Sequence, residues 1–281
     1  MNSDKRSWMR LLSLLTVLLL TLAACGSEEE TPDTGASPGD DAPEVTTIED
    51  GKLTVGSDIP YPPFEFKKGG ELQGLDIDLM DEIASRLGLE AEYVDTSFDT
   101  IFTQLAGGRF DAVVAASTIT PEREEQVNFS DPYYNAQQSL TVNVEETPDI
   151  KSTDDLESGD VVGVQSGTTG KDWANENLPE GVEIRSFPEG PDGYTNLEGG
   201  QVTAVINDEP TALAEIAERP GLELVQTIET GESYGIAVDP NNEELLDVIN
   251  DLLAEIIEDG TYEEIYGTYE DLPPGGNIAA E

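Results

Sequence analysis

The stretch from Phe110 to Arg123 constrains the fold most, because it joins an apolar run to a charged turn. Residues 110 to 116 are apolar apart from Asp111 and are partly β-branched, which predicts a short buried strand. Small and hydroxyl residues follow, and Thr120-Pro121 begins the turn that carries Arg123. A guanidinium a few residues past a strand end can bind a carboxylate through two parallel hydrogen bonds. We therefore expect an anion-binding group at this strand end, with a surface salt bridge of Arg123 as the alternative.

The composition excludes several classes of function. The 281 residues can bury a large core, and their formal charge of −47 repels nucleic acid and anionic lipid. The chain has no histidine, which excludes histidine-based triads and histidine–metal sites. Its single cysteine, Cys25, excludes an intrachain disulfide and a CxxC metal site. We therefore expect no cofactor, no metal ion and no nucleic-acid partner.

Other polar side chains also follow runs that predict strands. Asp58 and Tyr61 come after the first alternating run, where prolines stop the strand. The segment from Gln165 to Gly170 leads from an apolar run to a helix start, whose backbone N–H groups form an anion site. Asp208 lies just past a further strand. Ligands of open α/β sheets sit at such strand ends. A lone aspartate at a strand end is usually a cap or turn residue, however, which is the alternative for Asp208. The segment from Gln165 to Gly170 lacks the P-loop pattern that would indicate a phosphate site.

Four motifs occur together and in order, which makes the combination specific. They are Gln73-Gly74-Leu75-Asp76-Ile77-Asp78-Leu79, Ser117-Thr118-Ile119-Thr120-Pro121-Glu122-Arg123, Val127-Asn128-Phe129-Ser130-Asp131-Pro132-Tyr133-Tyr134, and the segment from Leu197 to Asp208. In these motifs the chain resembles the polar amino-acid class of the bacterial extracellular solute-binding proteins, family 3, which are the receptors of ABC importers. The resemblance extends from about residue 50 to residue 271.

The resemblance implies an α/β fold of the type II periplasmic-binding-protein class. In that fold two lobes, each a mixed sheet flanked by helices, are joined by two crossing strands. We expect residues 50–135 and 232–272 in the first lobe, residues 136–231 in the second, and a flexible tail at 273–281. The ligand should bind in the cleft, and the lobes should close over it by a hinge motion.

The first 49 residues indicate export and anchoring. Residues 1–24 combine a positive start with an apolar run too short to span a membrane, which predicts a signal peptide. Leu22-Ala23-Ala24 before Cys25 resembles a bacterial lipobox, so the resemblance implies that Cys25 is lipidated. Residues 25–49 hold almost no large apolar side chain and should form a flexible acidic tether. We expect a monomer that is lipid-anchored on the extracytoplasmic face of the cell membrane, with the ABC permease subunits as its protein partners.

The resemblance also implies a site for an α-amino acid. Arg123 should bind the α-carboxylate with help from N–H groups at Thr118 and Thr169. Asp208, the Thr118 hydroxyl and the Ala116 carbonyl should take the α-ammonium. A buried charge is tolerable only when it is paired, and a zwitterion supplies a partner for each of these ions.

The rest of the expected site surrounds the ligand side chain. Tyr61 and Phe98 should enclose its aliphatic part, while Asp58, Gln165 and the Ala115 carbonyl should face its far end. Thr168 belongs to the same site through the helix start that it shares with Thr169.

This set of groups contains no extra cation at the side-chain end, which disfavours glutamate and aspartate. It favours arginine, lysine, ornithine, histidine or glutamine, with a slight preference for the basic amino acids.

Two other classes of function stay open. The fold also resembles periplasmic cyclohexadienyl dehydratases, in which a cleft carboxylate acts as a general acid. The second alternative is a ligand-sensing lipoprotein.

Overall fold

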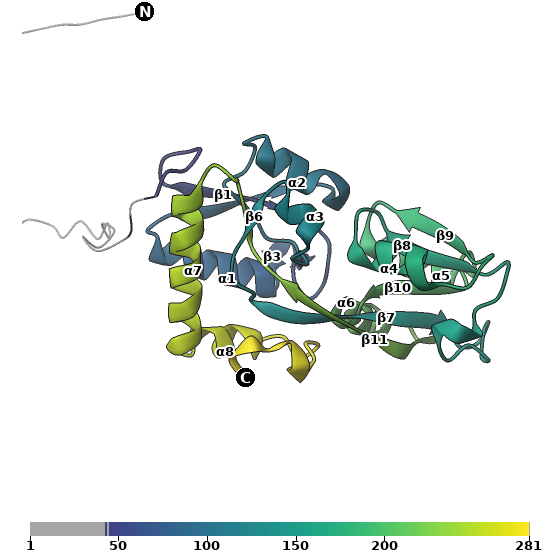
Figure 1. Ribbon diagram of the computed structural model, residues 1–281. Helices are drawn as coiled ribbons and strands as arrows, with labels where there is room; N and C mark the ends of the chain where they lie inside the picture. The colour runs from purple at the N-terminus through teal and green to yellow at the C-terminus, as the bar shows by residue number, and fades with distance from the viewer. Residues whose placement is uncertain (1–42, 44, 281) are drawn as a thin grey trace, which may run out of the picture. The chain divides into compact units, whose positions relative to one another are not determined.

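The computed structural model describes residue 43 and residues 45–280, whose strands divide between two five-stranded sheets and one small hairpin (Figure 1). The first sheet has the strand order β4-β1-β5-β12-β6. Strand β1 pairs in parallel with β4 and β5, whereas β12 runs antiparallel to β5 and β6, so the sheet is mixed. Its strands are β1 (Lys52–Ser57), β4 (Glu90–Asp95), β5 (Ala112–Val113), β6 (Asn128–Phe129) and β12 (Ala237–Val238).

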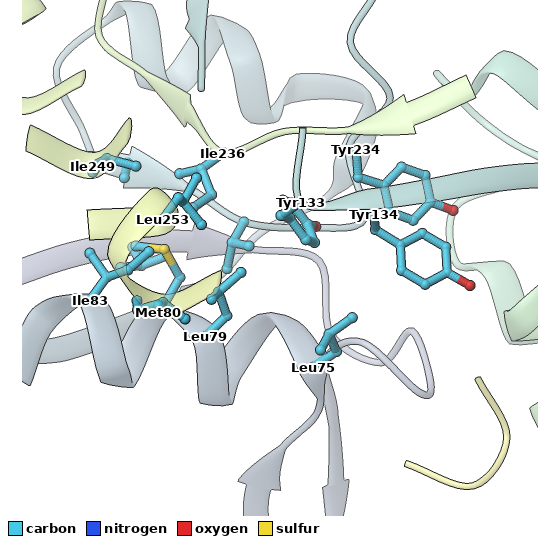
Figure 2. Packing of buried hydrophobic residues seen from close by; sticks show 14 of the residues in the cluster. Leu75, Leu79, Met80, Ile83, Tyr133, Tyr134, Tyr234, Ile236, Ile249 and Leu253 are labelled. Atoms are coloured by element: carbon cyan, nitrogen blue, oxygen red, sulfur yellow. The ribbon is translucent and has the colours of Figure 1, made fainter. Parts of the chain in front are cut away.

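Helices cover both faces of the first sheet, because its strands alternate their side chains between two apolar clusters. Ala112 and Val114 join the larger cluster, while Val113 and Ala115 join the smaller one, as the period of two requires. The larger cluster packs against α1 (Leu75–Arg86), α7 (Glu243–Glu258) and α8 (Thr261–Tyr266), and the smaller one packs against α2 (Phe98–Ala106). Figure 2 shows the α1 side chains in this larger cluster, among them Leu79, Met80 and Ile83.

The second sheet has the order β11-β7-β10-β8-β9. Strands β8 (Val161–Gln165), β9 (Glu183–Phe187) and β10 (Ala204–Asp208) are parallel, and the long strands β7 (Tyr134–Asn143) and β11 (Leu222–Tyr234) add an antiparallel edge. One face packs against α4 (Thr169–Asn177) and the other against α5 (Gly190–Glu198) and α6 (Glu209–Ala217). The expected α/β architecture of two mixed sheets flanked by helices is confirmed.

Strands β7 and β11 connect the two sheets. They pair antiparallel with each other from Leu222↔Asn143 to Tyr234↔Tyr134, with two register shifts on the way. Strand β7 begins soon after β6 of the first sheet, and β11 ends shortly before β12 of the same sheet (Figure 1). The chain therefore passes between the sheets along one two-stranded ribbon.

Four local features differ from the expectations. The buried run 110–116 contains only the two-residue strand β5. Residues 190–193, Gly-Pro-Asp-Gly, are typical of a loop but form the first turn of α5, where the N–H group that Pro191 lacks would have no partner in the helix. Residues 274–280 form two 3₁₀ turns, η2 (Pro274–Gly276) and η3 (Ile278–Ala280), which pack on the first core instead of extending as a tail. Ile48 lies within the expected tether, yet its N–H donates to Asp111 Oδ1 at 2.8 Å, so this end of the segment contacts the folded part of the chain.

The remaining described elements are short. They are the hairpin strands β2 (Phe66–Lys68) and β3 (Glu71–Gln73), the helix α3 (Pro121–Glu124) and the 3₁₀ turn η1 (Thr153–Asp155). Within residues 45–280, every helix is too short or too polar to cross a bilayer.

Candidate functional site

The loop after β1 brings three polar side chains to the carboxyl end of the first sheet. Asp58 follows the last residue of β1, and Tyr61 forms an isolated antiparallel bridge with Glu65. The Tyr61 N–H donates to the Glu65 carbonyl at 2.7 Å, which turns the chain back on itself. Asp58, Tyr61 and Glu65 are all buried, so this turn directs polar groups inwards.

The segment after β5 is held by a carboxylate of α1. The Ala116 N–H donates to Asp76 Oδ2 at 2.7 Å, and Tyr133 Oη donates to Asp76 Oδ1 at 2.8 Å. Ala116 has a φ of 42°, a left-handed conformation that costs energy for a residue with a Cβ and is found mostly where surrounding contacts impose it. Asp76 thus fixes the backbone whose carbonyls were expected to face the ligand.

Arg123 lies on α3, which begins at the capping residue Thr120. Its Nη1 donates to the Thr118 carbonyl at 2.6 Å, and its Nη2 donates to the carbonyl of Gly167, between β8 and α4, at 3.2 Å. The guanidinium also lies 5.1 Å from the ring centre of Phe98 and 5.0 Å from that of Phe102, within the range of cation–π attraction. Arg123 is therefore buried between aromatic rings and oriented by backbone carbonyls.

The second sheet contributes side chains from the ends of β8 and β10. Gln165 is the last residue of β8, and its Nε2 donates to Asp58 Oδ2 at 2.6 Å. Thr168 caps α4 by accepting the Lys171 N–H at 3.3 Å, which leaves Thr169 at the first position of the helix. The expected helix start is present, although the side-chain oxygen of Thr168 is already used as a cap.

Asp208 ends β10 and accepts hydrogen bonds from both sides of the site. Tyr61 Oη and Tyr234 Oη each donate to Asp208 Oδ2 at 2.6 Å, and Gln138 Nε2 donates to Oδ1. Burial raises the pKa of Asp208, while the bonds from Tyr234, Tyr61 and Gln138 and the charge of Arg123 counteract that rise. These hydrogen bonds favour the ionised form of Asp208, so that its buried carboxylate can pair with a cation.

All eleven residues expected in the ligand site line one pocket, together with Glu65. The cavity that these side chains enclose is about 10 Å³, far smaller than the roughly 300–1,000 Å³ typical of small-ligand pockets, so the two sides of the pocket lie close together. Groups from the two sheets contact each other across it, in the pairs Tyr61–Asp208, Asp58–Gln165 and Arg123–Gly167. The structure thus brings the expected residues together, while their part in binding stays a prediction.

The pocket is rich in carboxyl groups. Asp58, Glu65 and Asp208 line it, against Arg123 as the one lysine or arginine among its described lining residues. Burial, more than any other factor, raises the pKa of Asp58 to about 7, even though the hydrogen bond from Gln165 opposes the rise. Burial and the neighbouring Asp76 hold the pKa of Glu65 well above its usual range. For the described residues, no group of three acidic side chains is arranged to hold a metal ion.

Three contributors were missed in the sequence. Glu65 is the charged residue between Phe64 and Phe66, and this position in an apolar run was the signal that could have revealed it. Gln138 on β7 and Glu232 on β11 have no such signal. Glu232 Oε2 lies 3.1 Å from Gln138 Nε2, 3.3 Å from Thr118 Oγ1 and 3.2 Å from Thr169 Oγ1.

Comparisons with known proteins agree with this geometry. Residues 53–271 match the family model of the bacterial extracellular solute-binding proteins, family 3. The chain is 33% identical over 223 residues to the L-cystine-binding protein TcyJ of Escherichia coli K12, covering 77% of this chain and 82% of that protein. It is 31% identical to the histidine-binding periplasmic protein of Salmonella typhimurium LT2, covering 79% and 88%. Among solved structures, an ancestral arginine-binding protein bound to glutamine is 41% identical with a TM-score of 0.75, covering 79% of this chain and 99% of that one.

Proposed function

We propose that this chain, which belongs to the bacterial extracellular solute-binding proteins of family 3, captures an amino acid outside the cytoplasm and delivers it to an ABC permease. The relatives named above bind cystine, histidine, or arginine and glutamine, so an amino-acid ligand is the shared chemistry. The solved relative also supports the type II periplasmic-binding fold for this chain.

One observation carries the proposal: Arg123 and Asp208 approach the same pocket from the two different sheets. An α-amino acid carries a carboxylate and an ammonium on one carbon, so it can pair with both side chains at once. Each pair is charge-assisted and buried, and such pairs are stronger than bonds between neutral groups. A ligand that bridges the two sheets in this way stabilises their closed arrangement.

The side-chain end of the pocket supports a polar or basic ligand. Asp58 and Gln165 face each other there, and Tyr61 and Phe98 supply apolar surface for a methylene chain. We propose arginine, lysine, ornithine, histidine or glutamine as ligands, with the basic ones preferred. A second carboxylate at this end of the ligand would meet Asp58 and Glu65, so glutamate and aspartate are disfavoured.

A ligand screen tests the proposal. Thermal unfolding of the purified protein is measured with each of the twenty amino acids, ornithine and cystine. A ligand present at about 100 times its Kd stabilises the fold by ~2.7 kcal/mol, which raises the unfolding midpoint measurably. We expect such a rise for a few polar or basic L-amino acids and none for their D-enantiomers. No rise for any amino acid, or turnover of prephenate or arogenate, would contradict the binding-protein assignment.

We further propose that the protein is held at the membrane by lipid on Cys25. This residue lies outside the described part of the chain, so the proposal rests on the lipobox-like Leu22-Ala23-Ala24 and on the absence of another cysteine from the sequence. An extracytoplasmic location is shared by the periplasmic relatives.

A further inference from the structure

Asp58 is a buried carboxyl group whose charged neighbours are all acidic. It is 3% exposed, and Gln165, a neutral side chain, is its hydrogen-bond donor at 2.6 Å. The charged groups that act on it are Glu189 before α5 and Asp95 on β4, and Asp58 acts in turn on Glu65. Within residues 45–280, no lysine or arginine forms an ion pair with Asp58.

The charges of the pocket do not balance if every carboxyl group is ionised. Arg123 and Asp208 have opposite charges, and in the proposed function they pair with the two α-groups of the ligand. Of the carboxyl groups that line the pocket, Asp58 and Glu65 then remain, with no positive charge to offset either of them, and Glu232 adds a further acidic group beside Asp208. A buried carboxylate without a cation is costly, so such a group keeps its proton instead.

We propose that Asp58 gives up a proton in exchange for the positive charge of a ligand side chain, so that the pocket prefers cationic over neutral amino acids increasingly as pH rises towards neutrality. The inference rests on the proposed function and names its ligand class and its regulation. In the exchange, the Asp58 O–H bond breaks, the proton leaves to solvent, and the carboxylate pairs with the ligand's guanidinium or ammonium.

Hydrogen bonding selects Asp58 over Glu65 for this exchange. The hydrogen bond from Gln165 stabilises the ionised form of Asp58. Because the pKa of Asp58 is about 7, this group loses its proton near neutrality. No described amide or hydroxyl group donates to either oxygen of the fully buried Glu65, and its hydrogen-bonding neighbour is the Asp76 carboxyl group, which favours protonated Glu65. Glu65 therefore stays neutral, so the pocket gains one negative charge and matches a single ligand cation.

The experiment compares arginine with citrulline, which has the same shape and a neutral side chain. Their Kd values are measured by calorimetry on the purified protein between pH 5.5 and 6.5. Release of one proton requires arginine affinity to rise about 10-fold over this unit of pH, while citrulline affinity stays level. Neither ligand titrates in this range, and the chain has no histidine. The pKa values of the buried carboxyl groups of Asp76, Asp208 and Glu232 are also raised, so the variants below are needed to assign the proton to Asp58. A level arginine affinity would overturn the proposal even where arginine binds tightly.

Two pocket variants and one control identify the group. Asp58→Asn should abolish the pH dependence and weaken arginine binding at pH 7.5, with citrulline binding changed far less. Asp81→Asn removes a carboxyl group whose pKa is also raised but which lies outside the pocket, so it should keep the parental pH dependence. Loss of the dependence in Glu65→Gln with its retention in Asp58→Asn would show that the proton comes from Glu65, which would refute the proposal. Failure of every amino acid to bind would instead reject the proposed function.

Discussion

At the scale of residues, the proposed site predicts that binding of an amino acid depends on Arg123 and Asp208 together. Each is about 8% exposed, and removing one partner of a buried charged pair typically costs on the order of 2–5 kcal/mol. We expect Arg123→Ala or Asp208→Ala to weaken ligand binding roughly 30-fold or more. Calorimetry measures the loss, and circular dichroism checks that the fold is kept. Near-parental affinity in both variants would contradict the site.

The raised pKa of Asp58 also predicts how stability depends on pH without ligand. The unfolded chain loses this proton near pH 3.8, whereas the folded chain keeps it until about pH 7. The unfolded state therefore binds fewer protons in that interval, and the contribution of Asp58 to the free energy of unfolding falls as pH rises from about 4 to about 7. We expect a smaller fall in Asp58→Asn. Urea unfolding at several pH values measures it, and parallel curves for parent and variant would contradict the burial of a protonated Asp58.

The sequence reveals those site residues whose position depends on local structure. Asp58, Gln165 and Asp208 each lie at or just past a strand end, and strand ends can be recognised from apolar runs. Gln138 and Glu232 join the site through pairing of β7 with β11, and they are 94 positions apart. No local pattern distinguishes Glu232 from Glu229, so only the three-dimensional pairing could identify it.

At the scale of elements, the backbones of the two sides of the pocket come close together at a glycine. Gly167, between β8 and α4, has a φ of 80°, and a Cβ there would lie 2.9 Å from the Asp99 Cα of α2. Gly159 also has a positive φ, of 103°, but a Cβ there would meet open space. An alanine at either position would strain the backbone, but only an alanine at Gly167 would also clash with the other side of the pocket.

We expect Gly167→Ala to lower ligand affinity at least 10-fold, because the methyl group would hold the two sides apart. Both Gly167→Ala and Gly159→Ala should lose about 1–2 kcal/mol of stability from the left-handed backbone. Ligand titration and urea unfolding are measured on both variants. Equal affinities in Gly167→Ala, Gly159→Ala and the parent would show that this contact does not matter for binding.

Elements with a clear apolar period can be recognised in the sequence, whereas elements that contain helix-breaking residues cannot. The spacing of Leu245, Ile249, Leu252 and Ile256 identifies α7, whose buried side chains are those residues and Leu253. The residues at 190–193 instead suggest a loop, because two glycines and a proline are unfavourable inside a helix. They form the first turn of α5, where Pro191 is tolerated and where buried Gly190 and Gly193 pack against neighbouring side chains.

At the scale of the whole molecule, the lipid anchor should decide where the protein is found. Cys25→Ser removes the one thiol that could carry lipid. We expect the variant to leave the membrane fraction, or to keep its signal peptide because maturation is blocked. Cell fractionation and the mass of the product measure this outcome. A variant that partitions into membranes as the parent does would show that the attachment has another cause.

The strand order of the first sheet has a consequence for how the chain is made. Strand β12, near residue 237, lies between β5 and β6, although β6 is synthesised more than a hundred positions earlier. The second sheet, from β7 to β11, is contiguous in sequence. During synthesis on a ribosome, the strands of the second sheet can therefore pair with one another before β12, the partner strand of β6, has been made. Pulsed hydrogen exchange during refolding should protect β8 and β10 before β6, and simultaneous protection would contradict this order.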